Sequence, residues 1–265
     1  MAEPHWLPGK RAAQALRLEL NLGFAPVNVW DVIRDRGVEL ARHEFGERCG
    51  DGFYLWRGGC ALITINSSER AARQRFTAAH ELGHHELHRF EADDLAIADK
   101  DVFDTRGDPR EVAANAFGGY LLAPDEALQQ DSTGRARKDI VPRDVVELMR
   151  KYGLSYEATT NRLNLAGVVN QPNRKRVLEE GEGQIERLVR EAGFDEEAIF
   201  PFGPDLPAEL VDGALALYRD AVISADRLGD ILELDPEQAV TVAAERGYAR
   251  PEDPLYNESV AELLT

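Results

Sequence analysis

The sequence predicts an α+β fold, in which a small antiparallel sheet of about three strands packs on helices and a helical C-terminal region follows. Two observations support this fold class. Between residues 38 and 66, short segments alternate apolar and polar side chains and are separated by glycine-rich turns, as half-buried strands are. The flanking segments repeat apolar residues every three or four positions, as amphipathic helices do. The 265 residues suffice for one large domain or two small ones that need no disulfides.

The first 66 residues predict two helices and then the strands. Residues 9–22 have helical spacing, and FAPVNVWDVIRDRG predicts a turn followed by a second amphipathic helix. The strands are predicted in VELARHEF, DGFYLWRGG and CALITIN, which are rich in residues that suit a pleated surface.

The middle of the chain predicts helices separated by polar segments. Residues 91–108 are acidic and poorly periodic, so we expect a loop there. Pro109 suits the first turn of a helix, and REVAANAFGGYLL is expected to form that helix. Two short helices are expected within residues 140–169. The polar, glycine-containing residues 171–183 are the best candidate for a linker.

The charge distribution argues against direct binding of nucleic acid. The chain has 48 acidic and 31 basic residues, a net charge of −17, whereas a DNA-binding surface must neutralise phosphates. Residues 171–265 carry 22 acids and 9 bases, so the C-terminal third holds most of the excess. Within it, residues 222–247 have the cadence of helix, turn, helix, but only two bases against six acids. This acidic surface is either a solvated face or an attractive face for a basic protein partner.

The sequence predicts a cytoplasmic protein. No apolar run approaches the length of a membrane span, and the N-terminus lacks the residue order of a secretory signal. The two cysteines, Cys49 and Cys60, are close enough to bridge, but two thiols in a chain of this size are expected to be reduced.

The clearest chemical signal is His80-Glu81-Leu82-Gly83-His84, the pattern His-Glu-x-x-His. Residues four apart on a helix project from one side, so both imidazoles can bind one zinc ion. Glu81 points about a quarter-turn away, where it can hold a water on the metal and act as general base and then as general acid. The alternative is a surface helix with solvated histidines.

Two further histidines are not expected to bind the same ion. His88 lies roughly 12 Å along the helix from His80, so a helical cap, a buried hydrogen bond or exposure is expected for it. His85 points to another face. The extended metzincin pattern requires glycine and histidine where Leu87 and Phe90 stand, so that group is excluded.

A third ligand must come from another segment, because an open catalytic zinc site has three protein ligands. Glu111 begins the second helix, which favours it because helix-borne ligands are held rigidly. Asp104 and Asp108 in the preceding loop are alternatives. Glu111 has an alternative role too, since an acid in the first turn complements the helix dipole.

The two motifs RFTAAHELGHHELHR and EVAANAFGGYLLAP resemble those of the ImmA/IrrE family of metallopeptidases. YGLSYEATTNRLNLAGVV resembles a helical segment that follows the peptidase core in that family, so the resemblance covers about residues 10–170. Gly118 and Ala123 depart from the family pattern, and neither is expected to touch the site. The matching residues are Arg75, Phe76, Thr77, His80, Glu81, His84, Glu111, Ala114, Asn115, Phe117, Leu121, Leu122 and Pro124.

The resemblance implies a domain organisation and a substrate. Together with the charge distribution, it predicts a zinc metallopeptidase core at residues 1–135, a short helix-turn-helix-like segment at 136–172 and, beyond the resemblance, an acidic helical module at 173–265. Residues 60–66 are expected to pair along their edge with an extended substrate, or else to form a buried strand. The implied activity is limited cleavage of helix-turn-helix repressors of the XRE type.

The sequence therefore predicts a zinc-dependent endopeptidase in which His80, His84 and Glu111 bind the metal and Glu81 is the general base. Cleavage of a repressor would release genes for stress responses or mobile-element transfer. Mn²⁺ is an alternative metal in the cell, since availability decides occupancy. The alternative function is a non-proteolytic binding protein, or a toxin–antitoxin component, that sequesters a repressor and has a structural or vestigial metal site.

Overall fold

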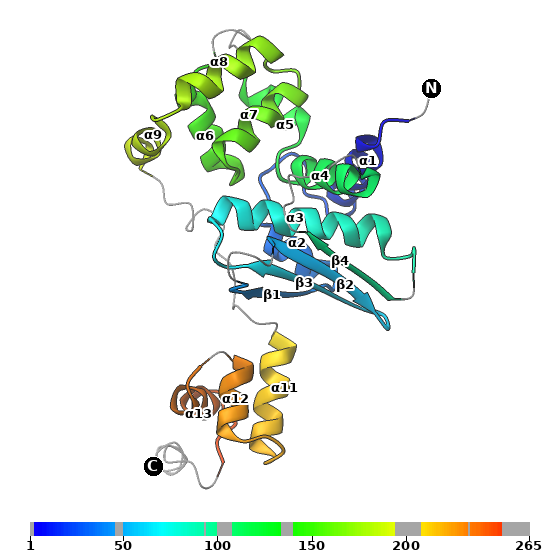
Figure 1. Cartoon of the computed structure of the whole chain (residues 1–265), viewed down its shortest axis with the longest axis vertical. Coiled ribbons are helices and arrows are strands. Elements are labelled where there is room, and N and C mark those ends of the chain that lie inside the picture. The colour runs from blue at the N-terminus through cyan, green and yellow to red at the C-terminus, as the bar shows by residue number, and fades with distance from the viewer. Residues whose placement is uncertain are drawn as a thin grey trace. The chain divides into compact units, whose positions relative to one another are not determined.

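The computed structural model describes residues 3–45, 50–92, 94–99, 108–133, 140–193, 208–232 and 234–250 (Figure 1). The chain divides into two compact units, residues 1–203 and 204–265. The first unit contains a small sheet packed on helices and the second contains helices among its described residues. The predicted α+β class is therefore confirmed.

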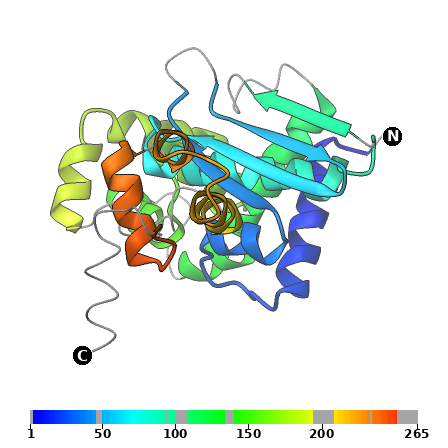
Figure 2. The same cartoon turned by 90° about the horizontal axis from the view of Figure 1, so that it is seen from below.

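The sheet has four strands, in the order β1-β3-β2-β4 (Figure 2). The strand β1 pairs in parallel with β3, whereas β2 pairs antiparallel with both β3 and β4. The prediction of about three antiparallel strands was therefore wrong in number and in the direction of one pair. The strands are β1 (Glu39–His43), β2 (Gly52–Arg57), β3 (Cys60–Asn66) and β4 (Asp94–Asp99).

The errors have physical causes. The hairpin of β2 and β3 leaves the far side of β3 open, and β1 fills that side running in the same direction as β3. The strand β4 lies in the segment 91–108, which was expected to be a loop, and the expectation failed because β2 supplies its hydrogen-bond partners. Because β3 lies between β1 and β2, it is an interior strand, and the expected edge pairing of residues 60–66 with substrate is wrong.

The first unit has nine described helices around this sheet. Both N-terminal helices, the helix after Pro109 and the two short helices expected within 140–169 are confirmed. They are α1 (Trp6–Glu19), α2 (Val29–Asp35), α3 (Ala71–His88), α4 (Pro109–Leu122), α5 (Asp125–Asp131), α6 (Pro142–Tyr152), α7 (Tyr156–Leu165), α8 (Gln171–Gly181) and α9 (Ile185–Ala192).

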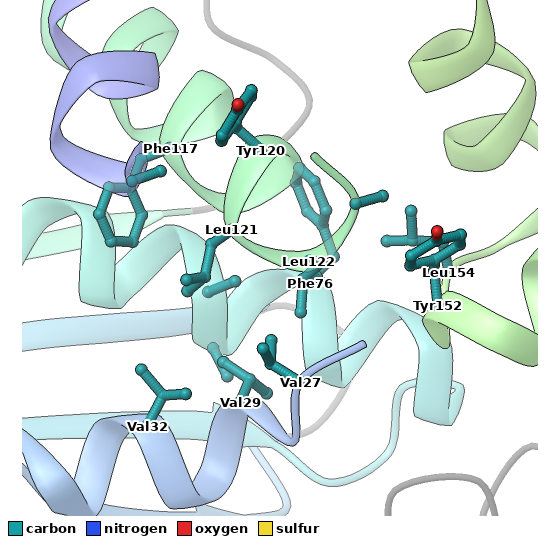
Figure 3. Close-up of a cluster of buried hydrophobic side chains, with 14 of the residues drawn as sticks. Val27, Val29, Val32, Phe76, Phe117, Tyr120, Leu121, Leu122, Tyr152 and Leu154 are labelled. Carbon is teal, nitrogen blue, oxygen red and sulfur yellow. The ribbon is translucent and has the colours of Figure 1, made fainter. Parts of the chain in front are cut away.

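Helix α3 is the central element of the first unit. It lies between the sheet on one side and helices α1 and α4 on the other (Figure 1). Fifteen of its eighteen residues are buried, so even its polar side chains are enclosed by protein. Figure 3 shows part of the surrounding core, which includes Val29 and Val32 from α2, Phe117 and Leu121 from α4, and Tyr152 from α6.

Small residues let α3 and α4 approach closely. A Cβ atom on Gly83 would lie 3.1 Å from Ala114 Cα, and one on Gly118 would lie 3.1 Å from the backbone nitrogen of His80. The expectation that position 118 does not touch the site is therefore wrong, because Gly118 packs on the backbone of a predicted ligand. At Ala123, the backbone oxygen accepts hydrogen bonds from Arg162.

Buried arginines connect the helical segment after α5 to this core. Arg75 of α3 donates from Nε to the backbone oxygen of Gly153, 2.8 Å away. Gly153 ends α6 in the left-handed conformation, with φ of 65°, which a glycine adopts without strain. The helices α6 and α7 are thus held on the same body as α3.

The expectation of a linker at residues 171–183 is wrong, because α8 occupies most of that segment. The Asn170 side chain accepts a hydrogen bond from the backbone of Asn173 and so caps the helix. Val177 is fully buried against the core, which gives this polar segment an anchoring side chain.

The second unit consists of α11 (Ala208–Arg219), α12 (Ala225–Leu232) and α13 (Pro236–Glu245) in its described part. The helix, turn, helix cadence of residues 222–247 is confirmed as α12, a turn and α13. A cluster of buried apolar side chains joins the three helices. Arg250 stacks over the ring of Tyr218 at 3.7 Å and donates to backbone oxygens of Tyr218 and Ile223.

Cys60 is an exposed free thiol at the start of β3, and Cys49 lies outside the described residues. None of the helices that the structure describes combines the length and apolar character that crossing a membrane requires.

Candidate metal centre

Helices α3 and α4 bring His80, His84 and Glu111 together. The Nε2 atoms of the two histidines lie 2.9 Å apart, and the carboxylate oxygens of Glu111 lie 3.2 Å from His80 Nε2 and 3.5 Å from His84 Nε2. Around one tetrahedral zinc ion, with bonds of roughly 2.0–2.1 Å, neighbouring ligand atoms lie about 3.3 Å apart. The three side chains therefore have the spacing of atoms that share an ion.

The start of α4 determines where Glu111 lies. The Asp108 side chain accepts a hydrogen bond from the backbone nitrogen of Arg110, 2.9 Å away, and Pro109 occupies the first turn. Glu111 follows in that turn, and its side chain is 17% exposed. Asp108 thus caps the helix, and the other alternative ligand, Asp104, lies outside the described residues.

Each histidine of the pair has a hydrogen-bond partner behind it. His80 Nδ1 lies 3.0 Å from Asn115 Oδ1, and because that oxygen only accepts, Nδ1 carries the proton. The Nε2 lone pair of His80 then points to Glu111 and is available to a metal. The sequence motif contained Asn115, but its role became visible only in the fold, where it lies one turn after Glu111.

His88 supports His84 in the same way. The Nδ1 atoms of His84 and His88 lie 3.0 Å apart, and both side chains are buried. Burial, with smaller contributions from His84 and Arg110, lowers the pKa of His88 to about 4, so this ring is neutral at pH 7 and has one nitrogen that can accept a hydrogen bond. When that nitrogen is Nδ1, it accepts the Nδ1 proton of His84 and leaves the Nε2 lone pair of His84 available to a metal. Of the three roles expected for His88, namely a helical cap, a buried hydrogen bond or exposure, the structure shows the buried hydrogen bond.

Glu81 lies on the side of α3 that faces the sheet. Its side chain is fully buried, and its Oε1 atom lies close to Gly52 at the start of β2. One turn further along, His85 is also buried, and its Nδ1 lies 3.1 Å from the hydroxyl of Tyr54 on β2. Burial lowers the pKa of His85 to about 4. His85 therefore serves the contact between α3 and β2, on a different face from the ligand atoms.

The donor set suits a divalent transition metal. Two neutral imidazoles and one carboxylate are the ligands that catalytic zinc sites use, and three protein ligands leave one position open. Both imidazoles are oriented by a hydrogen bond to their other nitrogen, as metal-binding histidines usually are. The residues present thus fit a metal ion, although other first-row metals accept the same donors.

Comparisons with known proteins identify a family and a relative that the chain is similar to. The family model described as the IrrE N-terminal-like domain, which belongs to a group of peptidases, matches residues 33–164. An immunity region protein of Bacillus phage phi105, described as uncharacterized, is 37% identical over 79 residues, which are 30% of this chain and 48% of that protein. The chain thus spans about half the length of this curated relative.

Proposed function

From its membership of the ImmA/IrrE family, which rests on the IrrE N-terminal-like domain at residues 33–164, we propose that the protein is a zinc-dependent endopeptidase. The observation that carries the proposal is the convergence of His80, His84 and Glu111, and Glu81 follows His80 directly in the chain. We assign the peptidase core to residues 1–135, followed by a helical segment at 136–172 and an acidic module at 173–265.

In this proposal, His80, His84 and Glu111 hold the metal. When bound, zinc lowers the pKa of a water molecule to about 7 and polarises the scissile carbonyl. Glu81 accepts the proton of the attacking water and then delivers it to the leaving amine, which is general base and then general acid catalysis. The buried position of Glu81 excludes bulk water from this proton.

Asn115 and His88 have supporting roles. Each accepts the Nδ1 proton of one ligand histidine, so that both Nε2 atoms present lone pairs to the same point. This pre-orientation reduces the rearrangement that metal binding requires. Mn²⁺ suits the same donors and is the alternative metal in the cell.

The proposed substrate is a transcriptional repressor of the XRE helix-turn-helix type. Two observations support this choice: the membership of the ImmA/IrrE family, and the similarity to a protein of a phage immunity region. Limited cleavage of the repressor would release stress-response or mobile-element genes. We place the reaction in the cytoplasm and expect no direct contact between this acidic chain and DNA.

The decisive experiment compares the wild type with Glu81→Gln and with Glu147→Gln, an exposed control on α6. Each protein is incubated with a purified helix-turn-helix repressor of the XRE type, and the products are identified by mass spectrometry. We expect one cut in the repressor with the wild type and the control, and none with Glu81→Gln. The same variants are then tested for relief of repression in cells.

The outcome separates the peptidase from a sequestering protein. If Glu81→Gln still relieves repression in cells, hydrolysis is not the mechanism, and a non-proteolytic binding protein with a structural metal replaces this proposal. Metal content measured on the same preparations shows whether a loss of cleavage reflects a loss of the ion.

A further inference from the structure

One row of side chains on α3 follows the beginning of β2. Its members recur every four residues and therefore share one face of the helix. At one end of the row, Arg73 Nη2 lies 2.5 Å from Asp51 Oδ2, and at the other end His85 contacts Tyr54. These two contacts hold β2 and the residue before it against α3, one on each side of Thr77 and Glu81. The row consists of Arg73, Thr77, Glu81 and His85.

Gly52 lies where the middle of this row meets the strand. A Cβ atom there would lie 2.7 Å from the Thr77 methyl carbon Cγ2, 3.1 Å from Glu81 Oε1 and 3.0 Å from the backbone oxygen of Thr64. The methyl group of Thr77 and the carboxylate of Glu81 thus approach the same point, and only a glycine leaves room for both.

The hydroxyl of Thr77 differs from those of other helical threonines in this chain. In α7, Thr159 and Thr160 donate to the backbone oxygens four residues earlier, each at 2.8 Å, which is the usual use of a threonine inside a helix. Thr77 is 1% exposed, yet its Oγ1 atom has no hydrogen-bond partner among the described residues. A buried hydroxyl in this state destabilises the fold, and such groups cluster where function requires them.

We propose that Thr77 is the positioning residue for Glu81. The hydroxyl donates a hydrogen bond to one carboxylate oxygen of Glu81 while the other oxygen takes the proton of the attacking water, and it keeps that orientation until the proton passes to the leaving amine. Gly52 leaves open the space that the Thr77 methyl group and Glu81 Oε1 both border. This inference rests on the proposed role of Glu81 as general base.

The test uses two variants of the full chain that separate the hydroxyl of Thr77 from its methyl group. Thr77→Val keeps the methyl group against Gly52 and removes the hydroxyl. We expect kcat for repressor cleavage to fall roughly 10-fold or more, as for loss of one hydrogen bond to a charged group, while KM and metal content stay unchanged. We also expect Tm to rise by about 2–4 °C, because the buried unpaired hydroxyl is gone.

Thr77→Ser is the conservative counterpart, which keeps the hydroxyl and removes the methyl group. We expect it to rescue kcat to within about threefold of the wild type while its Tm falls, because the contact with Gly52 is lost. Thr77→Ser should therefore have the higher kcat of the two variants, and Thr77→Val the higher Tm. A residue that only packs would lower both quantities together.

Each result decides the inference. It is overturned by a Thr77→Val protein with wild-type kcat, by a Thr77→Ser protein as inactive as Thr77→Val, or by a fall in Tm for Thr77→Val. A wild type that cuts the repressor while Glu81→Gln does not would leave the proposed function standing in any of those cases. A wild type that cuts nothing overturns the proposed function, and the inference with it.

Discussion

Helix α3 and the second unit differ in what they bury. Among the described residues, sixteen polar or charged side chains are buried, and eight of them lie on α3. The described part of the second unit buries only apolar side chains, such as Leu215, Leu228 and Ala239. Burying polar groups lowers the stability of a fold unless the groups are paired. The difference therefore shows that the polar groups of functional interest are concentrated on α3 and not in the second unit.

The comparison predicts that metal chemistry depends on α3 and α4 and not on the second unit. In the described part of the second unit the acidic side chains are exposed, where they favour solubility or a basic protein partner. Four sets of changes test whether metal binding and packing at α3 and α4 are independent of the second unit.

The largest expected effect is the loss of the metal when a ligand is removed. His84→Ala and Glu111→Ala should each weaken zinc binding by more than the roughly 10–100-fold that is typical of an outer-shell partner. Elemental analysis of untagged protein measures the metal per chain. His43→Ala is the matched control, because His43 is an exposed histidine on β1 and should leave the metal in place. Retention of the metal in the Glu111 variant would place the third ligand elsewhere.

A smaller effect is expected at the hydrogen-bond partner of His80. Asn115→Leu removes the acceptor for the Nδ1 proton and should weaken zinc binding roughly 10–100-fold. Asn115→Asp keeps an acceptor at that position and should remain within about threefold of the wild type. Competition with a chromophoric chelator gives both affinities. Equal affinities for the two variants would mean that the hydrogen bond does not orient the ligand.

Two helical glycines provide a matched pair in the two units. A Cβ atom on Gly9 of α1 would lie 1.8 Å from the backbone oxygen of Ala113 on α4, whereas one on Gly213 of α11 would meet nothing within 4 Å. Gly9→Ala should therefore destabilise the protein by about 1–3 kcal/mol through overpacking. Gly213→Ala should stabilise it by about 0.5–1 kcal/mol, because alanine is the better helix former. Denaturant titration measures both, and the same sign for both would contradict the packing described here.

The smallest effect is expected from removing the second unit. A chain that ends at residue 203 should bind zinc within about twofold of the full chain, because the three proposed ligands and their hydrogen-bond partners all belong to the first unit. A larger loss in the same chelator competition would show that the two units cooperate in the metal centre.

The sequence contained the ligand set because its signals are local. His80 and His84 are one helical turn apart, and Glu111 follows a helix cap and a proline in the next predicted helix. The role of Asn115 was not readable, since it contacts His80 across 35 positions of sequence. The sequence showed Thr77 as part of the motif but not its role, because whether a buried hydroxyl has a hydrogen-bond partner depends on the fold.

The errors in the fold have a common origin in long-range packing. The strand β4 is short and acidic at both ends, and its pairing with β2 outweighs its weak local pattern. The helix α8 looked like a linker because its charges and glycines dominate its composition, while one buried side chain, Val177, holds it in place. The parallel pairing of β1 followed from which side of β3 was open, which spacing along the chain does not encode.

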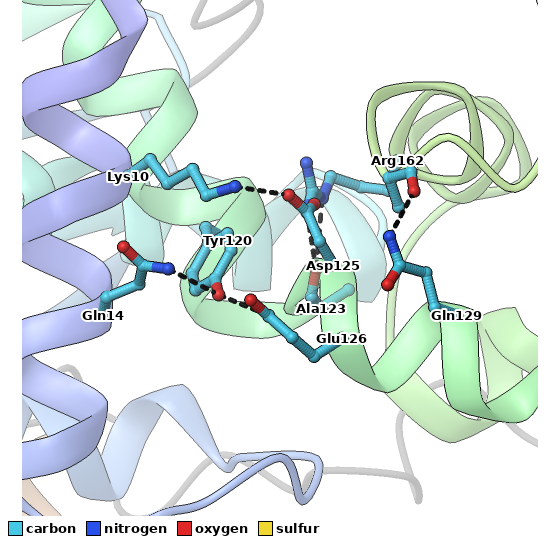
Figure 4. Close-up of polar contacts among 9 residues, drawn as sticks. Lys10, Gln14, Tyr120, Ala123, Asp125, Glu126, Gln129 and Arg162 are labelled. Carbon is cyan, nitrogen blue, oxygen red and sulfur yellow. Dashed lines mark hydrogen bonds and ion pairs between the residues drawn. The ribbon is translucent and has the colours of Figure 1, made fainter.

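The end of α4 opposite Glu111 is held by a polar network that joins three distant segments (Figure 4). Asp125, just after α4, accepts hydrogen bonds from Lys10 of α1 at 2.6 Å and from Arg162 of α7 at 2.5 Å. Arg162 also holds the backbone oxygen of Ala123, the residue that ends the helix.

Because α4 is a rigid helix between this network and Glu111, a small tilt at the network end displaces Glu111 at the other end. The fourteen residues of α4 span about 21 Å, so a tilt of about 3° at the network moves Glu111 by about 1 Å. An error of that size is half of a metal–ligand bond. The accuracy of the coordination geometry therefore depends on the far end of the helix as well as on the cap beside Glu111, through a carboxylate that is not a ligand of the ion.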